Sequence, residues 1–516
     1  MSFFGGQSGG DISLLVIYYI QKGRAEVSIS SRLKKLHNLL AWIPGTPVFG
    51  FILLLAAVLT VFLDAEVQGG LFFIAVICLE LLLCRDTSVT LLPFLLCCVF
   101  LCNCYNSFNV FIVYLPLAFP AVICLIFHFM VYRRAFSVGK SFPSLCAVAV
   151  AVTLGGLGTI SFSDYFAPTA VFYTLGLGFG MTFIYLLLRS RFAPPDETEA
   201  SQDGLFILGK HISFGQPTKD KLCFRLAFDM YLMGLFTAVC VADVYFKSLD
   251  SLIAVPGLVN FQASNNFSTF LMFALPFPFY FTMNTMKKRC GDAAFLPSDL
   301  HLIPAAVMYL AIVLTNSRGG LVFGTVEVLV CFVFTVYIRG GKRRIFYYAS
   351  AFFALLCTIF GGKLLLDYYR ENINSGIMNA TEARGGLILR ALEDFKRNFI
   401  FGSGLGYKGN SDLYNPVKGA MNWYHVYPAQ IVGSFGLCGI AAFGYMILTR
   451  LRLFLSRPNI WKLTLGLSYI GIFLMSLVNP GEFCPIPYEM LTVLLFIYLE
   501  FEEERETVSE QRRAEA

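Results

Sequence analysis

Apolar runs recur along the whole chain and are separated by short polar connections. Because a membrane-spanning helix needs about 20 apolar residues, we expect about fourteen transmembrane helices. The runs cover residues 47–64, 69–84, 88–104, 109–131, 143–163, 168–188, 226–246, 267–285, 301–316, 319–338, 345–366, 425–449, 459–478 and 486–500. The pattern therefore predicts an all-α, polytopic helical membrane protein.

The basic residues give the expected orientation. Groups of Lys and Arg lie at residues 32–35, 85, 133–134, 189–191, 287–289, 339–344 and 450–457. With the spans above, all these groups fall on one side of the membrane, together with both termini. The positive-inside rule makes that side the cytoplasm.

Long polar stretches divide the chain further. We expect an N-terminal cytoplasmic or interfacial segment (1–46), a first transmembrane bundle (47–300), a region 301–445, last helices at 446–500 and an acidic, frayed tail (501–516). The connection 192–225 is expected to be cytoplasmic, solvated and flexible. The connection 367–424 is the longest one outside, and Thr381–Lys396 within it has the apolar spacing of an amphipathic helix.

Composition agrees with this class and excludes others. Of 516 residues, 57% are hydrophobic and only 14% are charged, so the net charge of +6 reports topology and does not suggest a nucleic acid partner. The 15 cysteines lie mostly inside apolar runs, where a free thiol behaves as a small hydrophobic group. No His or Cys spacing suggests a metal site, and no cleavable signal peptide is evident.

Three side chains stand out for their positions. Arg318 lies in the step Ser317-Arg318-Gly319 between two spans, where small neighbours would let a ligand approach the guanidinium. Arg384 is expected in the first turn of the amphipathic helix, where a cation is unfavourable unless an anion binds nearby. His425 opens the next span, and its imidazole can accept a hydroxyl proton near neutral pH. Each also has an ordinary reading, as a snorkelling anchor, a solvated charge or a polar cap.

Other polar features have two readings each. Gly402, Gly404 and Gly406 alternate after the amphipathic helix, where they form either an ordinary turn or a set of backbone N–H groups for a phosphate. The acids inside predicted spans are Glu80, Asp229 and Glu327. Such carboxylates tend to be paired or functional, and we interpret Glu327 as a polar contact inside the bundle.

The order and sidedness of these motifs, over roughly residues 300–445, resemble the bacterial O-antigen ligase and O-antigen polymerase family. That family has a Ser-Arg-Gly step, then a long external loop with an Arg, an amphipathic helix and alternating glycines, and then a His that opens a span. Here His425 is followed by Gly436 and Gly439 at the family's spacing. The chain departs from the family at Val426, where Asn is usual, and at Ile388, where an aromatic residue is usual.

The resemblance implies a membrane-embedded glycosyltransferase, multi-pass in the bacterial cytoplasmic membrane, that needs no metal or cofactor. Its donor would be a glycan on undecaprenyl pyrophosphate, and its acceptor a hydroxyl of a glycan or glycolipid at the outer face, for cell-surface polysaccharide. Arg318 and Arg384 would clamp the pyrophosphate, and His425 would orient or deprotonate the acceptor, with inversion of the anomeric carbon. The remaining candidates for substrate contact are Gly404, Gly406, Tyr407, Lys408, Trp423 and Tyr424.

Three alternatives remain open. A repeat-unit polymerase belongs to the same family, although the His–Gly–Gly match favours a ligase. A flippase or transporter of lipid-linked oligosaccharide would suit the number of spans, but such proteins concentrate function near the bilayer midplane. A peptidoglycan polymerase would prefer an external aspartate such as Asp394 or Asp412, which have no recognisable setting in the sequence.

Overall fold

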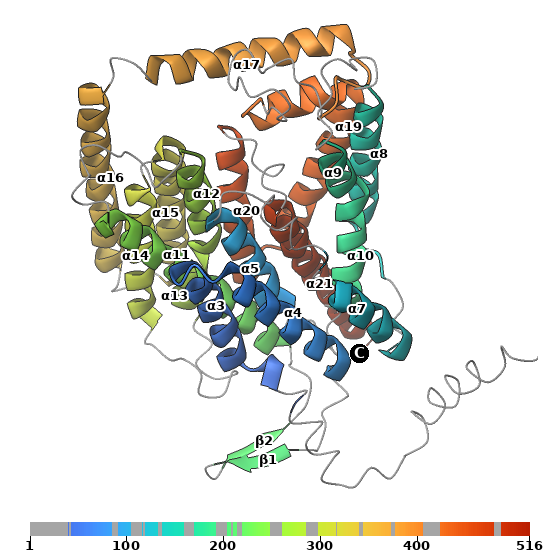
Figure 1. Ribbon diagram of the computed structural model, residues 1–516. Helices are drawn as coiled ribbons and strands as arrows, with labels where there is room; N and C mark the ends of the chain where they lie inside the picture. Colours follow the sequence, from blue (N-terminus) through green and yellow to red (C-terminus); the bar gives the residue numbers. More distant parts are fainter. Residues whose placement is uncertain are drawn as a thin grey trace, which may run out of the picture.

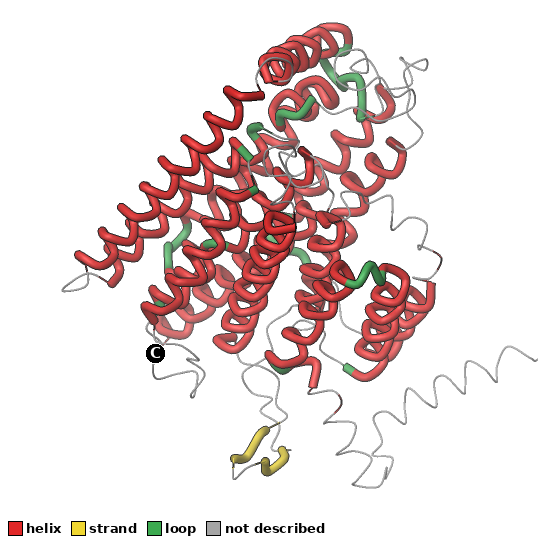
Figure 2. The backbone as a smooth tube through the Cα atoms, turned by 60° about the vertical axis from the view of Figure 1, so that its left-hand side comes forward, coloured by secondary structure: helices red, strands yellow, loops and turns green. Residues whose placement is uncertain are grey.

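The described part of the chain is a bundle of helices. The computed structural model describes residues 43–84, 91–104, 119–132, 137–158, 170–191, 204–207, 210–213, 219–247, 261–284, 298–315, 317–339, 344–372, 377–405, 424–478 and 487–515, and the single residues 40 and 116. Nearly all of these residues are helical, and most helices stand side by side (Figures 1 and 2).

The elements follow the apolar runs in chain order. They are η1 (Ile43–Gly45), α3 (Pro47–Phe62), α4 (Glu66–Leu83), α5 (Leu91–Cys104), α7 (Phe119–Tyr132), α8 (Phe142–Gly158), α9 (Ala170–Leu175), the π-helical turn η4 (Gly176–Gly180), α10 (Met181–Arg191), β1 (Gly204–Ile207), β2 (Lys210–Ser213), α11 (Lys219–Lys247), α12 (Phe261–Ala274), α13 (Pro276–Met283), η6 (Ser298–His301), α14 (Leu302–Leu314), α15 (Arg318–Arg339), α16 (Arg344–Asn372), α17 (Ile377–Arg397), α19 (Tyr427–Leu455), α20 (Ile460–Ser476) and α21 (Pro487–Glu515).

Several helices begin at residues whose side chains cap the backbone. Thr46 accepts a hydrogen bond from the N–H of Phe49 at 3.3 Å, and Pro47 occupies the first turn of α3. Asn459 does the same for α20 by accepting from the N–H of Lys462 at 2.8 Å. Such caps satisfy backbone donors that the helix itself leaves unbonded.

The helices differ in their capacity to cross a bilayer. By length and composition, the segments Cys223–Asp243, Arg318–Arg339 and Tyr427–Leu455 are long and apolar enough. Other apolar helices, such as α3 and α20, are shorter. The run 267–285 is divided, because Pro276 starts α13 immediately after α12. A mainly helical fold with three segments long and apolar enough to cross a membrane is thus observed among the described residues, while the total of fourteen spans stays a prediction.

Two connections differ from the prediction. Part of 192–225, expected to be flexible, forms the antiparallel hairpin β1–β2, with Gly204 opposite Ser213 and Ile207 opposite Lys210. The sequence of β1, Gly-Leu-Phe-Ile, is rich in residues that favour strands. The tail expected to fray after residue 501 instead continues α21 as far as Glu515.

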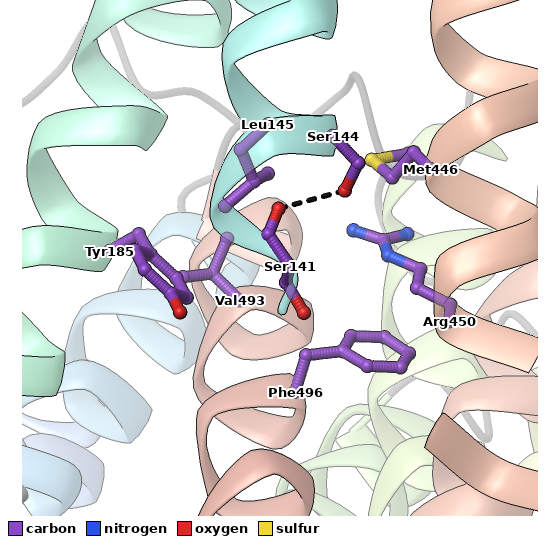
Figure 3. A pocket seen from close by; sticks show the side chains of 8 residues that line it. All are labelled: Ser141, Ser144, Leu145, Tyr185, Met446, Arg450, Val493 and Phe496. Carbon is purple, nitrogen blue, oxygen red and sulfur yellow. Dashed lines mark hydrogen bonds between the residues drawn. The ribbon is translucent and has the colours of Figure 1, made fainter. Parts of the chain in front are cut away.

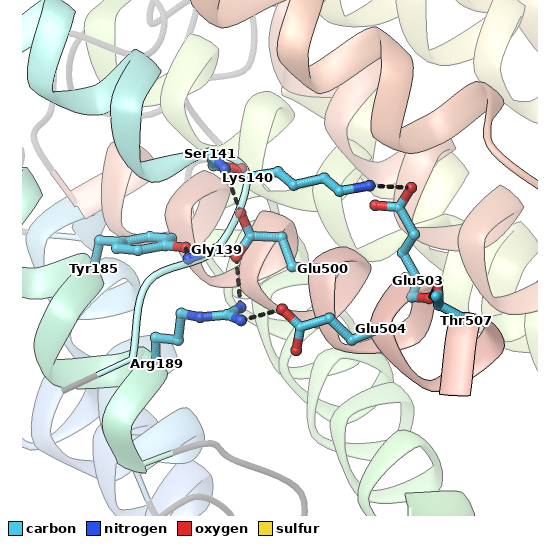
Figure 4. A network of polar contacts seen from close by, with 9 residues as sticks. All are labelled: Gly139, Lys140, Ser141, Tyr185, Arg189, Glu500, Glu503, Glu504 and Thr507. Atoms are coloured by element: carbon cyan, nitrogen blue, oxygen red, sulfur yellow. Dashed lines mark hydrogen bonds and ion pairs between the residues drawn. The ribbon is translucent and has the colours of Figure 1, made fainter. Parts of the chain in front are cut away.

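One cluster of ion pairs explains why the start of this tail is ordered. The buried carboxylate of Glu500 accepts hydrogen bonds from the hydroxyl of Tyr185 at 2.6 Å, from the guanidinium of Arg189 at 2.7 Å and from the N–H of Ser141 (Figure 4). Glu504 also pairs with Arg189, and Glu503 with Lys140. These contacts bind α21 to α10 and to the start of α8.

A second buried cation joins α19, α20 and α21. The guanidinium of Arg450 donates to the hydroxyl of Tyr469 at 3.0 Å and lies 4.7 Å from the centroid of the Phe496 ring. Glu489 is 3.5 Å away and supplies the opposite charge. A small cavity lies beside this group, lined by Ser141, Ser144, Leu145, Tyr185, Met446, Arg450, Val493 and Phe496 (Figure 3). The far end of α19 is therefore fixed to its neighbours.

One helix breaks the parallel arrangement. α17 lies across one end of the bundle, and in the chain it follows α16 and precedes α19 (Figure 1). Because α16 packs along α15 and leads into α17, the start of α15 lies at this same end of the bundle. Arg189 and Arg450 are near the C-terminal ends of α10 and α19, which lie toward the opposite end (Figure 1).

We expect Glu500→Ala to destabilise the protein strongly. The change leaves the Arg189 guanidinium, only 3% exposed, without a buried partner, which typically costs about 3–5 kcal/mol. Lys140→Ala is the control, because Lys140 is 66% exposed and such a pair contributes less than about 1 kcal/mol. Apparent melting temperatures of the purified variants measure the difference, and equal losses would contradict the assignment.

Candidate functional site

The Ser-Arg-Gly step is the start of α15. Ser317 is the N-cap, since its hydroxyl accepts the N–H of Gly320 at 3.1 Å and donates to Oδ1 of Asn265 at 2.6 Å. Arg318 is consequently the first residue of the helix and is half-buried. The serine therefore determines where α15 begins and ties that point to α12.

The two glycines after Arg318 serve helix packing. A Cβ atom at Gly319 would lie 2.8 Å from Cγ2 of Val478, and one at Gly320 would lie 2.7 Å from Cβ of Ser268. Both distances are too short for real atoms, so glycine is needed for α12 and the residues just after α20 to pack this closely against α15. Close helix contact therefore accounts for these two residues, while access of a ligand to the guanidinium stays a prediction.

Arg384 lies further into its helix than predicted. α17 begins at Ile377, so Arg384 is about two turns from the N-terminus and not in the first turn. The argument that the helix dipole opposes a cation at this position is therefore wrong, because that effect is confined to the first turn. The prediction failed because it placed the start of the helix at Thr381, four residues later than Ile377.

α17 buries a different stripe from the one its apolar residues suggest. Leu387, Ala391 and Asp394 are buried, whereas Ile388 and Leu392 are exposed. The buried stripe packs against the start of α19 and against Tyr424. The exposed apolar stripe is of the kind that an interfacial helix presents to lipid.

His425 lies where the chain turns into α19. It is half-buried and has a φ of 54°, a left-handed conformation that a residue with a side chain rarely adopts. Its neighbour Tyr424, for which contact with a sugar stays a prediction, is buried and donates from its hydroxyl to Oδ2 of Asp394 at 2.6 Å. The ring of Tyr424 lies against Gly433, where a Cβ atom would be only 2.8 Å from it.

The glycine turn that follows α17 packs onto a break in α19. Gly436 has φ 58° and ψ −149°, which interrupts the helix. The N–H groups of Leu437 and Cys438 donate to the carbonyls of Phe399 and Ile400, at 2.8 and 3.1 Å. In return, the carbonyls of Gly433 and Ser434 accept from the N–H groups of Ser403 and Gly404, both at 2.9 Å.

This exchange gives a hydrogen-bond partner to each of four backbone groups that the break in α19 separates. In a regular helix the N–H groups of residues 437 and 438 would pair with the carbonyls of 433 and 434. Here the turn supplies a partner for all four groups, which is essential where water is scarce. The N–H groups of Ser403 and Gly404 are thereby engaged with carbonyls, so binding a phosphate through them would first require these bonds to break.

The candidate residues fall into two described groups at the same end of the bundle. Arg318 lies with α12 and α20, while His425, Tyr424 and Gly404 lie where α17 meets α19. For Arg384 only its place in α17 is described. Gly406, Tyr407, Lys408 and Trp423 lie outside the described residues.

The acids inside the bundle have distinct settings. Asp229 pairs with Arg225 one turn earlier, with 2.9 Å between Oδ2 and Nε. Glu327 is buried in α15, and its carboxyl group packs where a Cβ atom at Gly471 would lie 2.9 Å away. Among the described residues, no group of three or more His, Cys, Asp or Glu side chains is placed to hold a metal ion.

Comparison with known proteins identifies the segment that carries these residues. Residues 303–444 match the family model described as O-antigen ligase. The match runs from α14 into α19 and includes Arg318, Arg384 and His425. No curated protein matches the chain. The resemblance stated from the motifs is thereby confirmed for this segment, and it supports a glycan-transferring role for a domain of this type.

We expect Gly402→Ala and Gly436→Ala to disrupt this region. Both residues have positive φ, and a Cβ atom at Gly436 would lie 2.6 Å from the carbonyl oxygen of Phe399. The left-handed conformation alone costs about 1–2 kcal/mol for a residue with a side chain. Gly444→Ala in the same helix is the matched control, because nothing lies within 4 Å of its Cβ position.

Thermal stability and limited proteolysis of the loop between α17 and α19 measure this effect. Gly402→Ala and Gly436→Ala should melt earlier and be cut faster there, while Gly444→Ala behaves as wild type. If all three variants behave alike, the backbone exchange between the turn and α19 is not what holds this region.

Proposed function

We propose that this chain, which carries an O-antigen ligase family domain at residues 303–444, moves a glycan from an undecaprenyl-pyrophosphate carrier to an acceptor hydroxyl at the outer face of the bacterial cytoplasmic membrane. The observation that carries the proposal is the position of Arg318 and His425 within the matched segment, at one end of the bundle. The product would serve cell-surface polysaccharide.

Arg318 is suited to bind an anion at the membrane surface. It is the first residue of α15, where the positive end of the helix dipole opposes a cation by about 0.3–1 kcal/mol. A pyrophosphate bound by the guanidinium at this helix N-terminus would reverse this cost. Arg384, on the helix that crosses this end, would supply the second guanidinium.

His425 would act on the acceptor. Its imidazole would orient the acceptor hydroxyl and take its proton as the oxygen attacks the anomeric carbon in line. The bond between that carbon and the pyrophosphate oxygen breaks with inversion, and undecaprenyl pyrophosphate leaves with the electron pair. The two arginines would stabilise the charge that develops on this leaving group, so no metal would be needed.

The distribution of cations supports the proposed sidedness. Among the helices that stand in the bundle, Lys140 precedes α8, Arg189 is near the end of α10 and Arg339 ends α15, all away from α17, whereas the cations of α17 belong to the crossing helix and not to the end of a span. If cations mark the cytoplasmic side, the end with Arg318 and His425 faces outward. Lipid-linked donors would then reach the site from the outer leaflet.

We expect Arg318→Ala, Arg384→Ala and His425→Ala each to reduce glycan transfer at least ~100-fold without loss of membrane insertion, as for removal of one stabilising group at a reaction centre. Arg318→Lys should also be strongly impaired, because an ammonium cannot reproduce a forked contact. Arg397→Ala, on the exposed end of α17, is the control and should retain transfer.

Mass spectrometry of lipid-linked glycans in the native host measures the outcome. In the His425→Ala strain, long finished chains on the carrier mean a ligase, and single repeat units mean a polymerase. An unchanged lipid pool with normal surface glycan would refute the catalytic role of His425 and reopen the transporter reading.

A further inference from the structure

Tyr424, immediately before His425, is held from several directions. Its hydroxyl donates to Asp394 of α17 at 2.6 Å and lies 3.5 Å from the hydroxyl of Ser403 in the glycine turn. Its N–H donates to Oε1 of Gln430 at 2.9 Å, and its ring covers Gly433. Three separate pieces of chain, α17, the turn and α19, therefore meet on this one side chain.

The residue after His425 is fixed as well. The carbonyl of Val426 accepts the N–H of Gln430 at 2.8 Å, and the amide of Gln430 in turn donates to Ser434 at 2.8 Å. Pro428 restricts the backbone of the same turn. Both neighbours of His425, Tyr424 and Val426, are therefore held by hydrogen bonds. These bonds explain how the unfavourable φ of 54° at His425 is maintained.

Asp394 is an unusual residue to find at the centre of this arrangement. Its side chain is 0% exposed, and its other oxygen lies 3.6 Å from Nε of Arg390, one turn earlier in α17. A buried carboxylate is costly unless it is paired and hydrogen-bonded. Since a leucine or alanine would pack at this place without that cost, the carboxylate indicates a requirement for the hydrogen bond to Tyr424.

We infer that Asp394, acting through Tyr424, is a positioning residue that holds the imidazole of His425 in place at the junction of α17 and α19. The inference rests on the proposed role of His425. It adds that α17, through the Asp394–Tyr424 hydrogen bond, determines where that imidazole lies.

The test measures the position of His425 independently of transfer. Diethyl pyrocarbonate modifies accessible imidazoles, and mass spectrometry of the full-length protein in lipid nanodiscs gives the rate at each histidine. Tyr424→Phe and Asp394→Ala should raise the rate at His425 at least threefold, because loosening its neighbour exposes a half-buried ring. His128 and His301, both buried, are internal references whose rates should stay unchanged.

A matched control exists at the far end of the bundle. Tyr185 is also buried and also donates to a buried carboxylate, Glu500, at 2.6 Å. Tyr185→Phe therefore removes the same type of hydrogen bond and should leave the rate at His425 within twofold of wild type. Transfer in cells should fall at least tenfold in Tyr424→Phe and Asp394→Ala and less than twofold in Tyr185→Phe.

Unchanged reactivity of His425 in both Tyr424→Phe and Asp394→Ala would overturn the inference, even if transfer were lost. An equal rise in Tyr185→Phe would overturn it too, because it would mean general loosening. If Tyr424→Phe does not accumulate in the membrane, Asp394→Ala and Ser403→Ala decide by the same measurement. Full transfer by His425→Gln would instead refute the proposed function, while the reactivity data would still decide the geometry.

Discussion

The break in α19 at Gly436 is the constraint on which the candidate site depends. A helix interrupted near the membrane surface leaves two donors and two acceptors without partners, and each costs several kcal/mol if it stays unbonded in an apolar environment. The turn after α17 supplies all four partners. The exchange requires backbones to approach so closely that Gly402 and Gly436 leave no room for a Cβ atom.

Through this exchange, α17 is also held in place by the contacts that α19 makes with other helices. Beyond the break, α19 runs to Arg450, whose contacts with Tyr469 and Glu489 fix its far end to α20 and α21. On the other side, Gly155 of α8 lies against the broken turn, because a Cβ atom there would be 2.8 Å from the carbonyl oxygen of Ser434. α17 is therefore attached to α19, which is fixed to its neighbours at both ends. Although α17 crosses the end of the bundle, it can thus hold a side chain in a defined position.

The sequence predicted where the helices lie better than it predicted what individual residues contact. Apolar run lengths are a local property, and they located most helices of the bundle and the segment that contains Arg318 and His425. The glycines were noticed for their spacing, but their partners are remote: Gly402 meets Ser434, and Gly319 meets Val478. Because close backbone approach is a tertiary property, a single sequence cannot distinguish a packing glycine from one that opens a ligand site.

Asp394 is a second residue whose surroundings a single sequence cannot reveal. An acid on an amphipathic helix is ordinarily assigned to the solvated face, and apolar residues such as Ile388 and Leu392 to the buried one. The structure reverses this, because Tyr424, thirty residues later, brings a hydroxyl to Asp394 and makes its burial favourable. In a membrane protein exposed apolar residues face lipid, so hydrophobicity no longer identifies the packed side of a helix. At the surface of such a bundle, a buried acid that accepts a hydrogen bond from another segment is a stronger indication of function than an apolar stripe.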